Sequence, residues 1–386
     1  MRLVRGPLVR RRRRHRLRAA LDRGARLSPT DGTNRLAVVV VNWERADLTT
    51  TAVRAVLAEG AADEVVVVDN GSSDDSLAVL RRELPDATVV ALDHNGGFAT
   101  GANAGIRHTD AETVVLLNND AVPAAGFVAA LRDHLAQAGP EVGAVTGRIV
   151  LAGRWTGLPA GATPEPDQRV LRDHTGRAWT PSPDGDVRLN STGVLVDRDG
   201  NGMDRDWFAP ADRVADVDVF GFSGGASALR RSALDDVGLL DESLFMYYED
   251  TELAWRLRRR GWRVEHAADA VVEHDHSASS GVQSDLFVFR NARNRLVVAL
   301  WHAPWPTVLR AAARTLVRGV RGLVVGRSGR SGRSGRSGHS GRSGREARLV
   351  LAALVDVAGA LPSHLARRLR ETRRASVPRR RIDTGA

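Results

Sequence analysis

Three short, mostly apolar runs, at residues 36–41, 64–68 and 113–117, constrain the fold of this chain more than any other feature. A run with so little polar interruption fits a strand that is buried on both faces of a sheet. Stretches typical of helices lie between the runs. Strands that alternate with helices predict an α/β fold, in which helices cover a mostly parallel central sheet.

A polar side chain follows each run at the point where the strand is expected to end. These side chains are Asn42, Asp69 and Asp120. Ligands of open α/β sheets bind at the edge formed by the carboxyl ends of the strands. The pattern therefore predicts a nucleotide site at this edge of the sheet.

The composition limits the class of protein and the kind of metal site. With 386 residues, of which 42% are hydrophobic, the chain is long and apolar enough to bury a sizeable core. It contains no cysteine, so any metal must be held by oxygen or imidazole ligands. We find no apolar run of about 18 residues and no apolar stretch typical of a signal peptide. We expect a cytoplasmic protein, either soluble or peripheral to the inner face of the plasma membrane.

The sequence divides into five segments by charge and composition. They are a basic disordered arm (1–34), the α/β domain (35–285), an amphipathic helical extension (286–326), a Ser-Gly-Arg low-complexity linker (327–345), and a C-terminal helix with a basic tail (346–386). Within the α/β domain, residues 151–215 are rich in Gly, Pro and Asp and are expected to form short hairpins or loops.

The net charge of +10 is concentrated at the two ends of the chain. Around residues 307–325, arginines occupy one face of an expected helix, and aliphatic residues occupy the opposite face: Leu309, Leu316, Val320 and Leu323. The aliphatic face could pack on the α/β domain, or it could lie on an anionic membrane surface. A nucleic-acid partner would explain the basic ends but not the acidic centre, so we do not expect one.

Three segments with acidic residues are candidates for chemistry. Asp69 could accept hydrogen bonds from a base or ribose, or it could belong to a plain turn that caps a helix. Asp120 could hold a divalent cation together with substrate phosphates, or it could sit in a turn before a helix. Glu249 and Asp250 begin an expected helix, where they could complement the helix dipole, or one of them could take a proton from an attacking hydroxyl.

Taken together, these segments resemble the family 2 glycosyltransferases over residues 36–276. The similarity is closest to the bacterial branch that contains rhamnosyltransferases and galactofuranosyltransferases. The matching segments are VVVVNWER (38–45), VVVVDNGSSDDS (65–76), NGGFATGANAGI (95–106), LLNNDAVP (116–123), the stretch 221–262 with its FMYYEDTELAWR motif, and VVEHDHSAS (271–279).

The resemblance implies a GT-A fold, which is a nucleotide-sugar-binding α/β sandwich, followed here by a C-terminal helical extension. It implies contacts to a nucleotide-sugar donor, with Asp69 on the base, from these residues: Asn42, Asp69, Asn70, Asn95, Gly96, Gly97, Asn103 and Asn119. It also implies that Gly224 and Gly225 lie on the acceptor side.

The resemblance implies a metal site for Mg²⁺ or Mn²⁺ as well. Asp120 occupies the last position of the family's Asp-x-Asp motif, although the first position is Asn118 in this chain. His274 stands where relatives place a metal-ligating histidine, and His276 is a possible substitute.

The expected function is inverting sugar transfer. Asp250, with Glu249 beside it, would deprotonate an acceptor hydroxyl, which attacks the anomeric carbon of a UDP- or dTDP-sugar. The resemblance favours rhamnose, galactofuranose or a similar sugar, and a lipid-linked or polysaccharide acceptor in cell-envelope (cell-wall) glycan synthesis. The alternative is a catalytically silent relative that binds a nucleotide sugar or glycan without transferring it.

Overall fold

The three apolar runs form the parallel strands β1 (Leu36–Asn42), β2 (Glu64–Asp69) and β4 (Thr113–Asn118), in which β1 lies between the other two. These strands belong to a computed structural model that describes residues 35–159, 161–162, 165, 168–215, 217–275, 284–328 and 337–385. The arm at residues 1–34 and the candidate ligand His276 lie outside the described residues.

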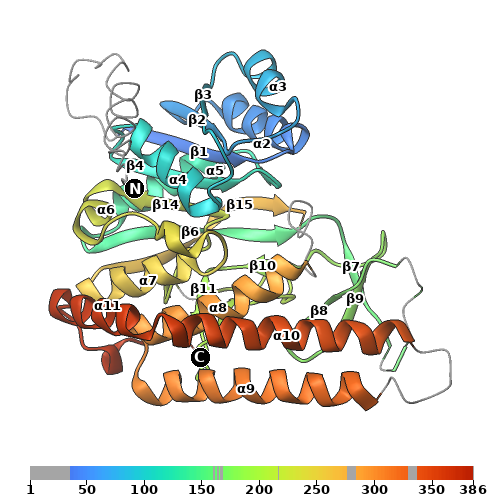
Figure 1. Cartoon of the computed structure of the whole chain (residues 1–386). Coiled ribbons are helices and arrows are strands. Elements are labelled where there is room, and N and C mark those ends of the chain that lie inside the picture. Colours follow the sequence, from blue (N-terminus) through green and yellow to red (C-terminus); the bar gives the residue numbers. More distant parts are fainter. Residues whose placement is uncertain are drawn as a thin grey trace, which may run out of the picture. The chain divides into compact units, whose positions relative to one another are not determined.

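One sheet carries the fold, and its main path runs β13-β15-β6-β14-β4-β1-β2-β3. Its further strands are β3 (Thr88–Ala91), β6 (Val142–Leu151), β13 (Asp218–Val219), β14 (Ala226–Arg230) and β15 (Arg263–His274). The pairs among β3, β2, β1 and β4 are parallel, as is the pair β6–β15, whereas β14 runs antiparallel between β4 and β6. This arrangement confirms the α/β prediction (Figure 1).

Burial on both faces explains why the first strand is continuously apolar. Val38 and Val40 pack into one core with Val53, whereas Val39 packs into a second core with Ile106. The helices that cover the sheet are α2 (Ala46–Glu59), α3 (Ser76–Glu83), α4 (Phe98–His108), α5 (Phe127–Gln137), α6 (Arg231–Val237) and α7 (Glu249–Arg260). Alternate side chains of a strand face opposite sides, so neither face of β1 is left for polar residues.

The segment 151–215 consists of short strands and loops, as predicted. The short strands in and beside it are β5 (Ala121–Pro123), β7 (Trp155–Gly157), β8 (Leu171–Arg172), β9 (Ala178–Pro181), β10 (Leu189–Ser191), β11 (Val194–Val196) and β12 (Gly202–Asp204). Strand β10 pairs with β6, and β5 pairs with β15, so both belong to the main sheet. Strands β11 and β12 form a hairpin of their own.

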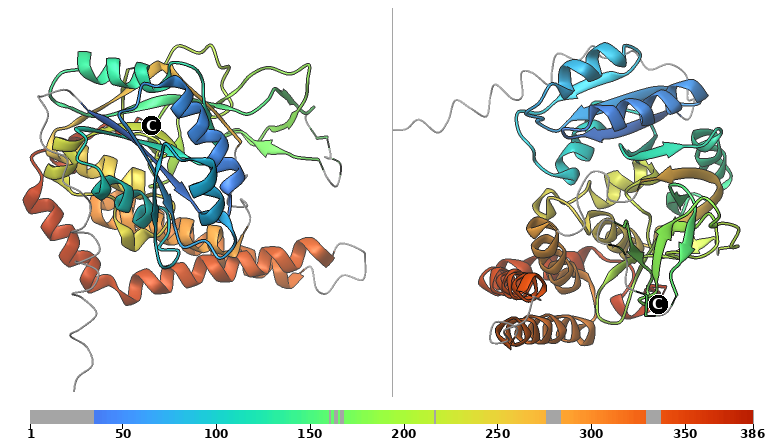
Figure 2. Two further views of the ribbon diagram at one scale, coloured as in Figure 1. Left: turned by 90° about the horizontal axis from the view of Figure 1, so that it is seen from above. Right: turned by 90° about the vertical axis from the view of Figure 1, so that its right-hand side faces the viewer.

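Four helices follow the sheet: α8 (Asp285–His302), α9 (Trp305–Ser328), α10 (Ser337–Gly359) and α11 (Leu361–Arg374). Helices α9 and α10 lie side by side (Figures 1 and 2). Helix α10 begins inside the segment predicted to be a flexible linker. Residues 329–336 of that segment are not among the residues that the structure describes. Close contacts of Gly319 with Leu351, and of Gly322 with Ala347, explain why the two helices approach so closely.

Helix α9 places its small residues, rather than its aliphatic face, against the rest of the protein. Ala311 and Thr315 are fully buried, whereas Leu309 is 67% exposed and Val320 is 48% exposed. The structure therefore does not show the first alternative, in which the aliphatic face packs on the α/β domain. In the described part of the chain no single helix is long and apolar enough to cross a membrane. The helix pair Ser343–Gly359 and Leu361–Arg374, bent by 68°, reaches that length and composition only when its two helices are counted together.

A buried ion-pair cluster joins α7 to the C-terminal helices. The carboxylate of Glu252 is fully buried and accepts hydrogen bonds from Arg256 at 2.7 Å and Arg367 at 3.2 Å, and His302 Nε2 lies 3.0 Å away. Burial by itself would raise the pKa of Glu252, but the positive charge of Arg256 and the bond to His302 hold it well below its usual range. Helices α8 and α11 therefore contribute directly to charge pairing within α7.

Candidate active site

Two neighbouring pockets lie at the carboxyl ends of the central strands. The first, which we call the acidic pocket, has a volume of about 300 Å³. Six of the predicted site residues line it: Asn119, Gly224, Gly225, Glu249, Asp250 and His274. The second, which we call the asparagine pocket, has a volume of about 190 Å³, and predicted residues also line it: Asn70, Asn95, Gly97 and Asn119. The two pockets are contiguous because they share five lining residues: Val41, Phe98, Asn119, Met246 and Tyr247.

Sheet register builds one wall of the acidic pocket. Strand β5 pairs with the end of β15, so that Ala121 lies opposite His274. The neighbouring Asp120 is thereby brought to His274, and its Oδ1 lies 3.0 Å from the histidine Nε2. The other ring nitrogen, Nδ1, lies 2.7 Å from Asn190 Oδ1. Asp120 is buried and does not itself line the pocket, whereas His274 does.

The start of α7 builds the opposite wall. Asp250 accepts hydrogen bonds from the backbone N–H of Gly224 at 3.2 Å and from that of Thr251 at 2.5 Å. Burial raises the pKa of Asp250. Burial, together with the negative charge of Asp250, raises the pKa of Glu249 to about 8. Because its pKa is about 8, Glu249 holds a proton at neutral pH.

The family is decided by a sequence comparison. A family model described as "Glycosyltransferase like family 2" matches residues 34–299. The chain belongs to the family 2 glycosyltransferases. It is 26% identical over 268 residues to the N-acetylglucosaminyl-diphospho-decaprenol L-rhamnosyltransferase of Mycobacterium tuberculosis, which covers 66% of this chain and 80% of that protein.

Further comparisons agree with this family. The chain is 28% identical over 217 residues to the pre-mycofactocin glycosyltransferase of Mycobacterium tuberculosis, which covers 55% of this chain but only 37% of that relative's length. Among solved structures, GalNAc-T7 with UDP, GalNAc and Mn²⁺ matches with a TM-score of 0.51 and 14% identity, over 87% of this chain and 58% of that chain. This structural likeness confirms the predicted GT-A fold of the family 2 chain.

The residues of this glycosyltransferase fit a divalent cation at Asp120 and His274. If the Nδ1–H of His274 donates to Asn190 Oδ1, the lone pair of Nε2 faces the Asp120 carboxylate. Two acceptors 3.0 Å apart need a proton or a cation between them. Carboxylate and imidazole ligands suit Mn²⁺, and the bond to Asn190 orients the ring as an outer ligand would. The described residues contain no cluster of three or more acidic or histidine side chains that could hold a metal, so substrate phosphates would complete the coordination.

Asp204 and Asn190 are site residues that sequence reasoning missed. Asp204, at the end of β12, lines the acidic pocket together with Asp250. Burial raises the pKa of Asp204 to about 6, although a hydrogen bond from Ser191 acts to lower it. Both missed residues belong to the segment expected to be loops. Strands of three residues leave no periodic pattern, so the sequence carries no signal that points to them.

The asparagine pocket is organised by the side chain of Asn70. Its Nδ2 donates to Asn95 Oδ1 and to the carbonyl of Gly97, both at 3.1 Å. Its Oδ1 accepts from the N–H of Gly96 at 3.2 Å, and Gly96 does not line the pocket. Trp43, which is 44% exposed, adds a flat aromatic surface to the same pocket. These contacts hold residues 95–97 against the end of β2.

Asn42, Asp69 and Asn103 line neither pocket, in contrast to their predicted donor contacts. Asn42 Nδ2 donates to Asp69 Oδ1 at 2.9 Å, and Ser72 Oγ donates to the same oxygen at 2.6 Å, so the structure fits the turn alternative for Asp69. Asn103 Nδ2 donates to the carbonyl of Leu240 at 2.8 Å. Asn103 Oδ1 also accepts the backbone N–H of Leu240 at 3.1 Å, so the side chain ties α4 to this backbone segment, and its donor contact stays a prediction.

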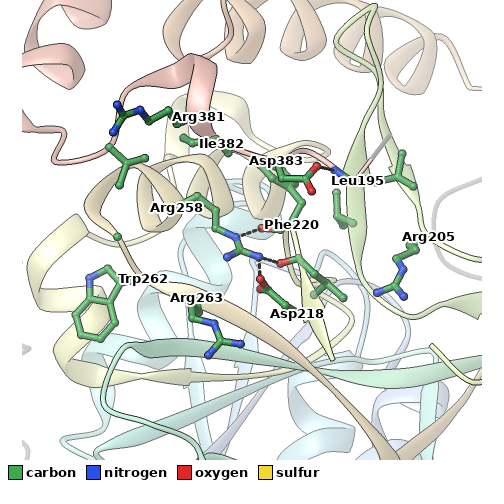
Figure 3. Close-up of a pocket in the computed structure, with 15 residues that line it drawn as sticks. Leu195, Arg205, Asp218, Phe220, Arg258, Trp262, Arg263, Arg381, Ile382 and Asp383 are labelled. Carbon is green, nitrogen blue, oxygen red and sulfur yellow. Dashed lines mark hydrogen bonds and ion pairs between the residues drawn. The ribbon is translucent and has the colours of Figure 1, made fainter. Parts of the chain in front are cut away.

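A larger pocket, of about 680 Å³, lies elsewhere (Figure 3). It is at the carboxyl end of α7 beside the C-terminal segment, and none of the predicted site residues lines it. Arg258 points into this region, and its guanidinium is already bound to Asp218 at 2.6 Å and to the carbonyl of Phe220 at 3.1 Å. The acidic pocket, rather than this larger one, is the candidate active site.

Proposed function

We propose that this chain transfers a sugar from a nucleoside diphosphate donor to an acceptor hydroxyl with inversion at the anomeric carbon. The observation that supports the proposal most strongly is the position of Asp250, whose carboxyl group lines a pocket contiguous with the asparagine pocket. The asparagine pocket would take the nucleoside, with Trp43 available to stack on the base. The acidic pocket would take the sugar and the acceptor.

The chemistry follows from the two walls. Asp250 takes the proton of the acceptor hydroxyl, and the oxygen forms a bond to the anomeric carbon. The bond from that carbon to the diphosphate breaks, and its electron pair leaves with the nucleoside diphosphate. A single displacement of this kind inverts the anomeric centre. Glu249, which keeps its proton, places no second charge beside the base. A divalent cation, Mg²⁺ or Mn²⁺, held by Asp120 and His274 would stabilise the charge that develops on the leaving diphosphate.

We propose that the donor is a UDP- or dTDP-sugar that carries rhamnose, galactofuranose or a similar sugar, and that the acceptor is lipid-linked or a polysaccharide. The support is the rhamnosyltransferase relative, whose name specifies a decaprenol-linked acceptor and 80% of whose length is matched. A role in cell-envelope glycan synthesis follows from the same relative.

The test is a transfer screen of nucleotide sugars with and without Mn²⁺, using decaprenol-linked and soluble glycan acceptors. We expect one donor to raise the melting temperature of the protein and to yield a transferred product only when an acceptor is present. A protein that binds a donor but yields no product with any acceptor would support the silent-relative alternative and contradict the proposal.

We further propose that α9 attaches the protein to the inner face of the membrane. Leu309, Leu316, Val320 and Val324 are all exposed on this helix, beside exposed arginines that would contact anionic headgroups. In flotation with vesicles that contain phosphatidylglycerol, Val320→Asp should reduce binding. Val214→Asp, at a valine that is 92% exposed in another part of the chain, is the matched control. Equal flotation of the two variants would contradict this attachment.

A further inference from the structure

The segment that leads into the acidic motif has an unusual backbone. Phe245, Tyr247 and Tyr248 have φ angles of 68°, 68° and 73°, although none of them is glycine. Bulky side chains disfavour this left-handed region, because Cβ crowds the following backbone. Such a conformation persists only where the surrounding structure holds it in place.

One side chain holds most of this segment. Asn294 of α8 is fully buried, and its Nδ2 donates to the carbonyls of Leu244 at 2.9 Å, Met246 at 3.0 Å and Tyr247 at 2.9 Å. Arg293 donates to Asn294 Oδ1 at 2.9 Å, which fixes the amide with its nitrogen toward the segment. The two N–H groups of a single amide are therefore shared among three carbonyls of the segment, of which that of Leu244 also accepts the backbone N–H of Met246 at 2.8 Å.

The same face of α8 supports the segment through its rings. The ring of Phe287 meets that of Tyr247 edge-on, with centroids 5.1 Å apart. The guanidinium of Arg290 lies 5.0 Å from the centre of the Phe245 ring. Residues 287, 290 and 294 share one helical face, so one side of α8 contacts the segment at several points.

The segment in turn sets the position of the candidate base. Met246 and Tyr247 line both the acidic and the asparagine pockets. Tyr248 is the residue from which α7 starts, and Asp250 lies in the first turn of that helix. A shift of the segment would therefore move the carboxylate relative to the acceptor, and would disturb the asparagine pocket less, because Asn70 and Asn95 are held by hydrogen bonds outside the segment.

We propose that Asn294 is a positioning residue for the transfer reaction, and that it acts by holding residues 244–248 so that Asp250 faces the acceptor oxygen. The inference rests on the proposed function but assigns a role to a helix outside the acidic motif. Misplacement of a reacting group by about 1 Å can lower the rate about a hundredfold. The effect should appear in kcat rather than in the affinity for the donor.

The test uses Asn294→Asp and Asn294→Ala in the full chain. The aspartate is nearly isosteric but offers acceptors to the three carbonyls in place of N–H donors. We expect kcat to fall about tenfold to a hundredfold, with the dissociation constant of the donor changed less than about threefold. The control is Asn291→Ala, one turn earlier on α8, because the side chain of Asn291 forms no hydrogen bond within the described residues. Its kcat should match that of the wild type.

Further readouts separate this proposal from a merely structural role and from the proposed function. Hydrogen exchange at the amides of residues 245–250 should accelerate in Asn294→Ala, whether or not an acceptor is known. An active wild type with unchanged kcat in folded Asn294 variants would overturn the positioning role alone, as would unchanged exchange. A wild type that transfers no sugar would count against the proposed function instead. If neither Asn294 variant folds, Phe287→Leu should lower kcat about threefold to tenfold, and an unchanged kcat would again overturn the proposal.

Discussion

The two walls of the acidic pocket are built in different ways. The wall with Asp120 and His274 follows from sheet register, because the pairing of β5 with β15 brings the two residues together. The wall with Asp250 depends on a segment with three positive φ angles, which side chains of α8 hold in place. The first wall is supported by many backbone hydrogen bonds, whereas the second is supported by a few side chains. Substitutions far from the chemistry should therefore affect the second wall more.

The largest effect should come from the base itself. Asp250→Asn keeps the size of the side chain but removes the group that accepts the proton, so we expect kcat to fall about 10²–10⁴-fold. Donor affinity, measured by calorimetry with a non-hydrolysable donor, should stay near that of the wild type. Asp110→Asn, at a carboxylate that is 75% exposed, is the control. Transfer at the wild-type rate by the Asp250 variant would remove it from the mechanism.

A somewhat smaller loss should follow removal of the carboxylate on the other wall. For Asp120→Ala we expect activity to fall about a hundredfold or more, because a bound cation contributes several kcal/mol of charge stabilisation. Donor binding should lose its dependence on Mn²⁺, which a titration with and without the metal would show. Full wild-type activity in excess chelator would rule out a metal role for this wall.

The next effect concerns the residue that orients His274. Asn190→Ala removes the partner of Nδ1, and loss of such outer partners lowers metal affinity about tenfold to a hundredfold. At saturating Mn²⁺ the activity should return to near the wild-type value. An Mn²⁺ titration curve that coincides with that of the wild type would mean that register alone orients the imidazole.

The last effect concerns stability rather than the rate of transfer. The pKa of Glu249 is raised from 4.5 to about 8, so the folded protein binds this proton more tightly than the unfolded chain does. Its contribution to stability is complete below about pH 4.5 and is lost as the pH rises through about 8. Glu249→Gln should therefore reduce the loss of melting temperature between pH 5 and pH 8, by an amount equivalent to roughly 3 to 4 kcal/mol. Parallel curves for the two proteins would contradict the buried, protonated state.

The sequence predicts the wall with Asp120 and His274 better than the wall with Asp250. Continuous burial leaves a plain signal in β1, β2 and β4, and the polar residues after β4 mark the edge where Asp120 lies. Asp250 was also predicted, because the acidic motif is compact in sequence. Asn294, Asn190 and Asp204 were not, because each acts through partners that are distant in the chain and belongs to no motif.

The amphipathic pattern of α9 did not predict which face of the helix is buried. The periodicity of its arginines and aliphatic residues predicted a helix, and the structure contains one. The buried face, however, consists of Ala311, Thr315 and small neighbours, which allow close helix packing. Residue size, rather than hydropathy, decided which face points inward.

The buried Glu252 cluster has a consequence for where the catalytic unit ends. By sequence, the chain after residue 326 is a Ser-Gly-Arg linker followed by a C-terminal helix and a basic tail. A protein shortened at that point would lose Arg367 and leave Glu252, two residues from Asp250, with fewer cations around a fully buried charge. We therefore expect removal of α11 to destabilise α7, whose first turn carries Asp250.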